Sequence, residues 1–144
     1  MKNPLHPAAA DFVKRLERPG TPMFYQLSVA AQRIAQEKML QAFGPSPVAM
    51  AQVREATIGR PDAAGGDLSF RLYRPLSGGG GAQSDKPLPA LCWFHGGGFT
   101  VGSLAGFDGF FRQLAQLSGC VLLAPAYRLA PEHPFPAALE DSLY

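Results

Sequence analysis

A histidine and three glycines, His95–Gly98, stand directly after the apolar run Leu88–Phe94 and before Phe99. Glycine loses more backbone freedom on folding than any other residue, so three in a row point to a need for backbone without side chains. Backbone N–H groups gathered at a strand end stabilise negative charge, either on a phosphate or on the oxyanion that forms during acyl transfer. The residues therefore indicate an anion-stabilising loop, and the two chemistries have to be distinguished.

The phosphate alternative fits the spacing poorly. A dinucleotide-binding G-x-G-x-x-G pattern needs glycine where this chain has Val101. The next helix is expected to begin near Gly106, too late to aim its N-terminus at an anion held by the glycines. A second glycine run, in residues 77–87, lacks the lysine of a phosphate loop and is interpreted as a linker. A plain tight turn needs only one or two glycines, so an H-G-G-G oxyanion loop is favoured.

The segments around the glycines predict a parallel α/β unit. Leu88–Phe94 and Cys120–Ala126 are continuously apolar, as in central strands covered on both faces. Between them, Phe107–Leu117 repeats apolar residues at helical spacing, so the three segments are expected to form a right-handed crossover. The glycines then lie at the carboxyl end of a strand, where open α/β sheets bind ligands. A further helix is expected to open at Pro136.

The first half of the chain predicts helices followed by a strand pair. Helices are expected over Asp11–Arg18 and Met23–Phe43, the second with an apolar stripe at a 3.6-residue period. Strands are expected over Val48–Ile58 and Asp67–Pro75, and the short connection between them favours antiparallel pairing. The second strand alternates, with one face expected in the core and the other, Ser69 with Arg71 and Tyr73, in solvent.

Composition excludes several classes of protein. The 144 residues are 47% apolar and 17% charged with a net charge of +2, an ordinary globular balance that argues against nucleic-acid binding. No apolar run approaches the roughly 20 residues of a membrane span, and no secretory signal is visible, so a cytoplasmic location is expected. Cys92 and Cys120 are expected to be buried thiols, and neither a metal site nor a cofactor is expected.

A second motif, YRLAPEHPFPAALED at Tyr127–Asp141, follows the second apolar run. Together with HGGGFTVGS it resembles the hormone-sensitive-lipase family of α/β-hydrolase esterases. The resemblance is strong over Leu88–Tyr144. In the N-terminal half it rests only on the order of elements, with a helical region first and a strand pair after it. It implies the N-terminal part of an α/β-hydrolase fold, with residues 1–47 as a helical cap and residues 48–144 as an incomplete core. It also implies a carboxylic-ester hydrolase for short to medium acyl esters, with a small-molecule ester as substrate.

The resemblance assigns roles to the residues of both motifs. Gly97 and Gly98 look like the oxyanion-hole donors, and His95 with Gly96 looks like the organiser of their loop. The family's catalytic histidine lies far downstream, so His133 is assigned to the structural motif and not to proton transfer.

Further residues are expected around the site. Phe99 is expected to line the substrate pocket, together with Phe24 and Tyr25 of the cap. Arg128 and Glu132 are expected to form a supporting charge pair.

The nucleophile of such an enzyme is missing from these residues. Ester hydrolysis on this fold uses a serine in G-x-S-x-G followed by Asp or Glu and His. Ser46 has Gly44 before it but Val48 after it, and no other serine fits better. We therefore expect the chain to be inactive alone and to need the missing C-terminal half of the fold or a second copy. The alternative is a non-catalytic small-molecule-binding protein on the same fold.

Overall fold

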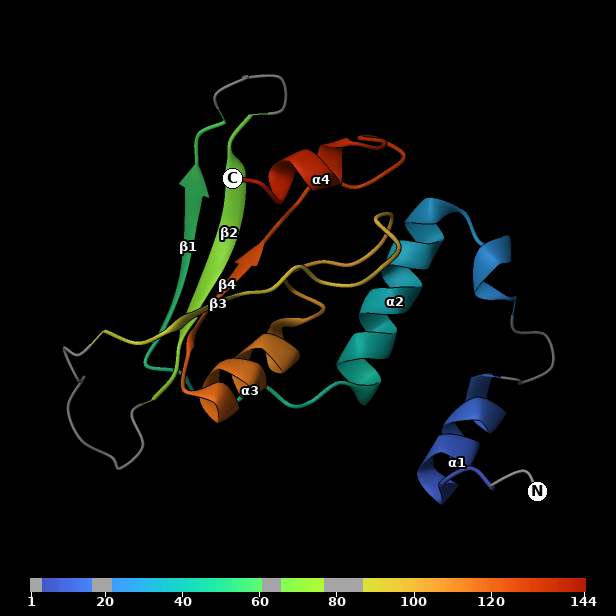
Figure 1. The fold of residues 1–144 in the computed structure, drawn as a ribbon. Helices are drawn as coiled ribbons and strands as arrows, with labels where there is room; N and C mark the ends of the chain where they lie inside the picture. The colour runs from blue at the N-terminus through green and yellow to red at the C-terminus, as the bar shows by residue number, and fades with distance from the viewer. Residues whose placement is uncertain (1–3, 17–21, 61–65, 77–86) are drawn as a thin grey trace.

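A four-stranded mixed sheet organises the protein, seen in a computed structural model that describes residues 4–16, 22–60, 66–76 and 87–144 (Figure 1). The spatial order of the strands is β1-β2-β4-β3. The pairs β1/β2 and β2/β4 are antiparallel, and β3/β4 is parallel. This confirms both the expected antiparallel pair and the expected crossover. The strands are β1 (Gln52–Ile58), β2 (Leu68–Arg74), β3 (Ala90–Cys92) and β4 (Val121–Pro125).

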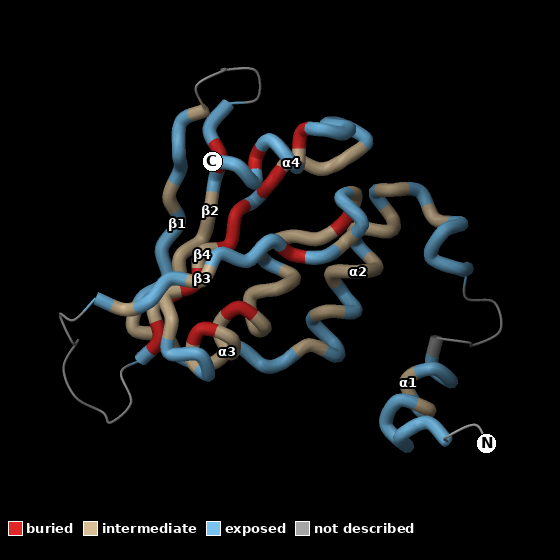
Figure 2. Tube along the Cα trace, in the orientation of Figure 1, coloured by how far each residue is buried: buried red, intermediate tan, exposed pale blue. Residues whose placement is uncertain are grey.

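The core lies between the sheet and the crossover helix α3 (Asp108–Ser118). Helix α3 packs on β2 and β4, and Figure 2 shows buried backbone along β4 and along the inner side of α3. Gly119 ends the helix in a left-handed conformation (φ 69°) and donates its N–H to Ala115. The fully buried core residues are Tyr73, Phe111, Ala115, Leu122 and Ala124.

The two apolar strands differ in how they are covered. Strand β4 lies between β2 and β3, and Leu122 and Ala124 are fully buried, as expected for a central strand. Strand β3 lies at the edge of the sheet formed by the described residues, and Cys92 is exposed. The expectation of two buried thiols is therefore wrong for Cys92, while Cys120 is half-buried. Residue 91 packs on the core side, so Cys92 points to the opposite face of an edge strand.

The face of β2 that was expected in solvent is covered by α3 at Tyr73 and in part at Arg71, whereas Ser69 is exposed as expected. Tyr73 is completely buried against Phe111, with ring centroids 5.7 Å apart. Its hydroxyl donates to Oδ1 of Asp108 at 2.9 Å, and the Arg71 guanidinium lies 3.2 Å from the same oxygen. The prediction of a solvent face failed because Asp108, from the first turn of α3, satisfies polar groups that alternation alone assigns to water.

Replacing Tyr73 by phenylalanine should flatten the response of stability to alkaline pH. Burial raises the pKa of the Tyr73 phenol to about 12, and Asp108 adds to the rise while Arg71 opposes it. The folded pKa exceeds the unfolded one, so this stabilisation is present below about pH 10 and is lost as pH rises toward the folded pKa. Tyr73→Phe should lower the free energy of unfolding at pH 8 by about 1 kcal/mol.

Urea unfolding at pH 8 and pH 11 measures this effect. The matched control is Tyr25→Phe, because Tyr25 is 75% exposed and should leave both values unchanged. An identical fall in stability between the two pH values for Tyr73→Phe and the unmodified protein would contradict the assignment.

Three helical segments precede the sheet: α1 (Pro7–Leu16), the short 3-10 helix η1 (Phe24–Gln26) and α2 (Val29–Phe43). The single helix expected over Met23–Phe43 is thus interrupted. Ser28 caps α2, and its hydroxyl accepts the N–H of Ala31 at 3.3 Å. The end of the first expected helix, residues 17–18, lies outside the described residues.

The apolar stripe of α2 does not mark its inner face. Ile34 is 57% exposed, whereas the side toward the glycine loop carries Arg33 and Leu40. Helix α1 lies apart from the sheet and meets α2 through an edge-to-face contact of Phe12 with Phe43 (Figure 1).

The remaining helix, α4 (Ala137–Asp141), opens directly after Pro136, as expected. The helices described here all fall short of the length and apolarity that a membrane span requires. All strands follow residue 48 and the helices α1 and α2 precede it, but the division into cap and core stays a prediction.

Candidate functional site

The glycine loop that follows β3 requires glycine at specific positions. Gly97 (φ 144°), Gly98 (φ 59°) and Gly102 (φ 109°) occupy the positive-φ region that other residues rarely adopt. A Cβ at Gly97 would overlap the carbonyl oxygen of Val101, and one at Gly102 would overlap the ring of His95. A hydrogen bond closes the turn: the Gly97 carbonyl accepts the N–H of Val101 at 3.0 Å.

The N–H groups of Gly97 and Gly98 donate no hydrogen bond within the part of the chain that the structure describes. The two donors are adjacent in sequence and lie in a turn whose conformation is closed by its own carbonyl. They are therefore available to a ligand. Their role as oxyanion donors stays a prediction.

His95 holds the start of the loop. Its ring is 5% exposed and stacks with Tyr127 at a centroid distance of 4.5 Å and with Phe107 at 5.5 Å. Nδ1 lies 3.0 Å from the carbonyl oxygen of Gly96, and the Tyr127 hydroxyl donates to the carbonyl oxygen of His95 at 2.5 Å. Burial lowers the pKa of His95, although the Gly96 carbonyl opposes this. A neutral imidazole whose Nδ1 proton is bound by Gly96 fits an organising role.

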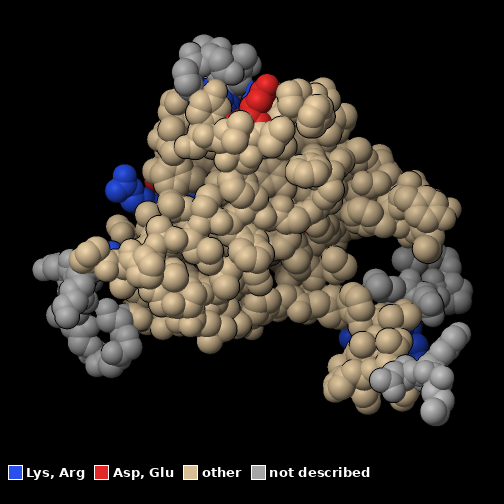
Figure 3. All heavy atoms as spheres, in the orientation of Figure 1, with Lys and Arg blue, Asp and Glu red and all other residues tan. Residues whose placement is uncertain are grey.

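A cavity of 540 Å³ opens beside the loop. Phe94, His95, Phe99 and Tyr127 line one side, and residues from the segment 130–142 line the other, including His133. Gly97 and Gly98 are not themselves in the lining but lie between two residues that are. Figure 3 shows a face with almost no charged side chains between α4 and α2. The surroundings of the loop therefore suit an apolar ligand.

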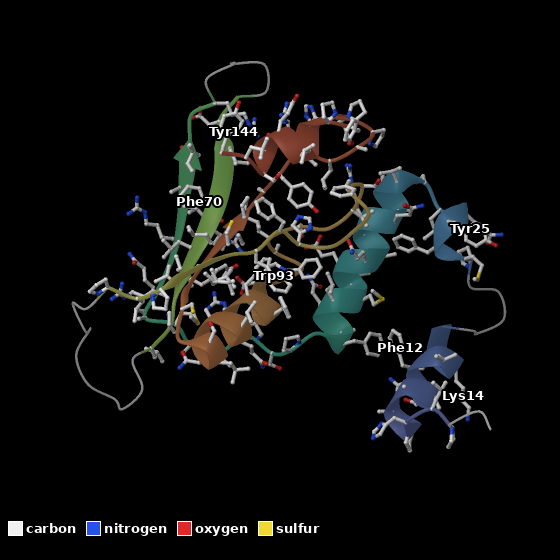
Figure 4. All side chains as sticks on the ribbon, in the orientation of Figure 1. Phe12, Lys14, Tyr25, Phe70, Trp93 and Tyr144 are labelled. Atoms are coloured by element: carbon white, nitrogen blue, oxygen red, sulfur yellow. The ribbon has the colours of Figure 1, made fainter. Side chains whose placement is uncertain are left out.

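Two of the predicted pocket residues lie elsewhere. Phe24 is 46% exposed and Tyr25 is 75% exposed, and neither lines the cavity. Figure 4 shows Tyr25 at the outer end of η1, far from the loop. Both residues precede Ser28, where α2 begins, and the structure places them away from this cavity. Phe99 lines the cavity, and its role in binding substrate stays a prediction.

The predicted charge pair between Arg128 and Glu132 is also wrong. Arg128 binds Asp141 at 2.9 Å and Glu140 at 3.1 Å, whereas Glu132 binds Arg33 at 2.7 Å. Asp141 lies in the same motif and could have been considered. Nothing in the sequence around Arg33 indicated its partner 99 residues away.

Asp141 is the centre of a buried ionic cluster. It is 1% exposed and accepts the backbone N–H of Arg128 at 2.8 Å. The guanidinium of Arg60 lies 3.0 Å from Oδ2, the same oxygen that accepts the Arg128 N–H, and both side chains of that pair are almost fully buried. The cluster joins α4, which forms a wall of the cavity, to the chain after β4 and to the end of β1.

Comparison with known proteins is consistent with this geometry. Residues 91–144 match the family model described as alpha/beta hydrolase fold. The carboxylic ester hydrolase LipN of Mycobacterium tuberculosis is 37% identical over 114 residues, which cover 79% of this chain and 27% of that protein. The ethyl acetate hydrolase of Pseudomonas putida is 44% identical over 81 residues, which cover 55% of this chain and 24% of that protein.

Solved esterase structures have the same fold. A hyperthermophilic esterase from the archaeon Pyrobaculum calidifontis matches with a TM-score of 0.76 and 37% identity, covering 97% of this chain and 42% of that one. An ester hydrolase from the metagenome of Lake Arreo matches with a TM-score of 0.78 and 35% identity, covering 94% of this chain and 41% of that one. The chain thus spans well under half the length of the proteins it matches.

The strand order, the crossover and these similarities lead to one assignment. The chain has the fold of the N-terminal part of an α/β-hydrolase, and it is similar in sequence and structure to esterases of that fold.

Proposed function

We propose that this chain forms the oxyanion side of a carboxylic-ester hydrolase that acts on short to medium acyl esters. The observation that carries the proposal is the pair of available N–H groups at Gly97 and Gly98, beside an apolar cavity at the end of β3. A serine attacks the acyl carbonyl, its oxygen gains negative charge, and the two amides donate to it. One such donor lowers the barrier by roughly 3–4 kcal/mol. Water then releases the acid and restores the serine.

The nucleophile, the acid and the base come from outside these 144 residues in this proposal. No serine of the chain stands in G-x-S-x-G. In this proposal the C-terminal half of the fold supplies them, because a second copy of the same chain would lack the same serine. The similar proteins named above are ester hydrolases and esterases, which supports the reaction type.

The 144-residue chain alone should not hydrolyse p-nitrophenyl acetate in a way that a serine-directed phosphonate inhibits. A chimera tests the other half of the proposal: the chain replaces the matching stretch of the Pseudomonas putida ethyl acetate hydrolase, which retains its own remaining residues. This chimera should hydrolyse the ester, and the same chimera with its G-x-S-x-G serine changed to alanine should not. Phosphonate-sensitive turnover by the pure chain would contradict the missing nucleophile.

The alternative function is non-catalytic binding of a small molecule on the same fold. The two functions differ in the full-length protein that contains this chain. An intact G-x-S-x-G with a later Asp and His, together with ester turnover, supports the hydrolase. Saturable binding of an apolar ligand without turnover supports the binding protein.

A further inference from the structure

Arg33 of α2 reaches the glycine loop from the opposite end of the chain. Its Nε donates to the carbonyl oxygen of Thr100 at 2.9 Å, and its Nη2 donates to the carbonyl oxygen of Ala130 at 3.0 Å. The same guanidinium forms a bidentate pair with Glu132, with distances of 2.8 and 2.7 Å. One side chain thus joins the cap helix, the glycine loop and the segment that follows β4, and Figure 1 shows α2 running alongside that loop.

The acceptors of Arg33 are directly connected to the glycine turn. The N–H of Thr100 donates to the Gly97 carbonyl at 3.1 Å, and its hydroxyl donates to the Gly98 carbonyl at 3.1 Å. The N–H of Ala130 donates to the Phe99 carbonyl at 2.8 Å. Arg33 fixes the carbonyls of Thr100 and Ala130, and these two residues bond to the carbonyls of Gly97, Gly98 and Phe99. The contacts of Arg33 therefore restrict the backbone on the C-terminal side of the two available amides.

The turn needs such a support from outside. Glycine residues restrict their own backbone little, so the directions of the Gly97 and Gly98 amides depend on the surrounding contacts. Phe99 has a φ of 59°, a conformation that a bulky residue retains only when its surroundings impose it. The contacts that reach this part of the turn from beyond it include the bond of Arg33 to the Thr100 carbonyl, the bond of Ala130 to the Phe99 carbonyl and an edge-on contact of the Phe99 ring with Tyr127.

The ion pair itself does not explain the arrangement. The side chain of Arg33 is 33% exposed and that of Glu132 is 55% exposed, and ion pairs in contact with water contribute little to stability. The hydrogen bond from Arg33 lowers the pKa of Glu132 to about 2, so the carboxylate stays ionised at neutral pH. The bidentate pair of the guanidinium with this carboxylate therefore keeps its geometry. Planar bidentate geometry fixes where the remaining guanidinium N–H groups point.

We propose that Arg33 is a positioning residue that sets the directions of the Gly97 and Gly98 amides from the cap helix α2. This inference rests on the proposed function and adds a contact between the cap and the oxyanion loop to it. Arg33 does not line the cavity. Its loss should therefore lower kcat and leave KM nearly unchanged.

The experiment uses the chimera with the Pseudomonas putida ethyl acetate hydrolase and measures kcat and KM for p-nitrophenyl esters. Arg33→Met should lower kcat by about 10- to 100-fold, because small misplacements of catalytic groups have effects of this size. Arg33→Lys retains the charge but not the fork, and it should lower kcat in the same direction. Glu132→Gln leaves both carbonyl contacts of Arg33 in place and should reduce kcat less than either arginine variant.

The matched control is Arg15→Met, because Arg15 forms an exposed ion pair with Asp11 on α1 and should retain full kcat. Thermal unfolding shows which variants are folded. If Arg33→Met fails to fold, Arg33→Lys decides: a kcat equal to that of the unmodified protein overturns the inference. A rise in KM with kcat unchanged in either variant also overturns it. Absence of ester turnover in the unmodified protein instead refutes the proposed function, so the two failures are distinguishable.

Discussion

Gly97→Ala is expected to lower kcat/KM for ester hydrolysis by about 100- to 1000-fold, the effect of losing one oxyanion donor. Gly97 has a φ of 144°, and an added Cβ would overlap the carbonyl oxygen of Val101. That oxygen belongs to the backbone and cannot move aside without opening the turn. The directions of the amides of residues 97 and 98 would then change. Steady-state kinetics with p-nitrophenyl acetate in the chimera with the Pseudomonas putida ethyl acetate hydrolase measures the loss.

A second glycine with positive φ provides the control. Gly119 has a φ of 69°, lies at the end of α3, and an added Cβ would have nothing within 4 Å. Gly119→Ala should lower the free energy of unfolding by about 1–2 kcal/mol, the strain of a left-handed alanine, and leave kcat/KM unchanged. Equal activity losses in the two variants would mean that the effect at Gly97 is general instability and not a loss of oxyanion donors.

Asp141→Asn is expected to lower the free energy of unfolding by about 3–5 kcal/mol, because it removes one partner from a buried ionic cluster. The asparagine keeps the size of the side chain but leaves Arg60 and Arg128 facing each other without the carboxylate between them. Since domains are stable by only about 5–15 kcal/mol, most of the margin would be lost. Urea unfolding monitored by tryptophan fluorescence measures it, because the single tryptophan, Trp93, lies beside α3.

The same substitution on the surface is the control for Asp141. Asp11 pairs with Arg15 one turn along α1, and both side chains are more than half exposed. Asp11→Asn should change the free energy of unfolding by at most about 1 kcal/mol. A loss at Asp141 no larger than the loss at Asp11 would contradict the view that the buried cluster anchors α4.

Local patterns in the sequence were sufficient for the elements that depend on neighbours along the chain. The apolar run at Cys120–Ala126 predicted the central strand β4, and helical spacing predicted α3 to within one residue of each end. The antiparallel pair β1/β2 followed from two strand patterns and a short connection. The run His95–Gly98 indicated a loop that needs glycine. A positive φ and a close approach of the backbone both favour glycine over other residue types, so this requirement can be seen in the sequence.

Contacts between distant segments were decided only by the tertiary structure. Tyr73 was assigned to solvent because alternation along β2 contains no information about Asp108, which covers it from α3. Arg33 resembles any exposed helix residue until the fold brings it to Thr100, 67 residues away. The periodicity of apolar residues predicts which face of a single helix or strand is buried. The partner of a charged group or a hydroxyl depends instead on how the helices and strands pack together. The sequence therefore determined the strand-loop-helix unit and the glycine loop, and the packing of α2, α3 and α4 around them determined what holds that loop in place.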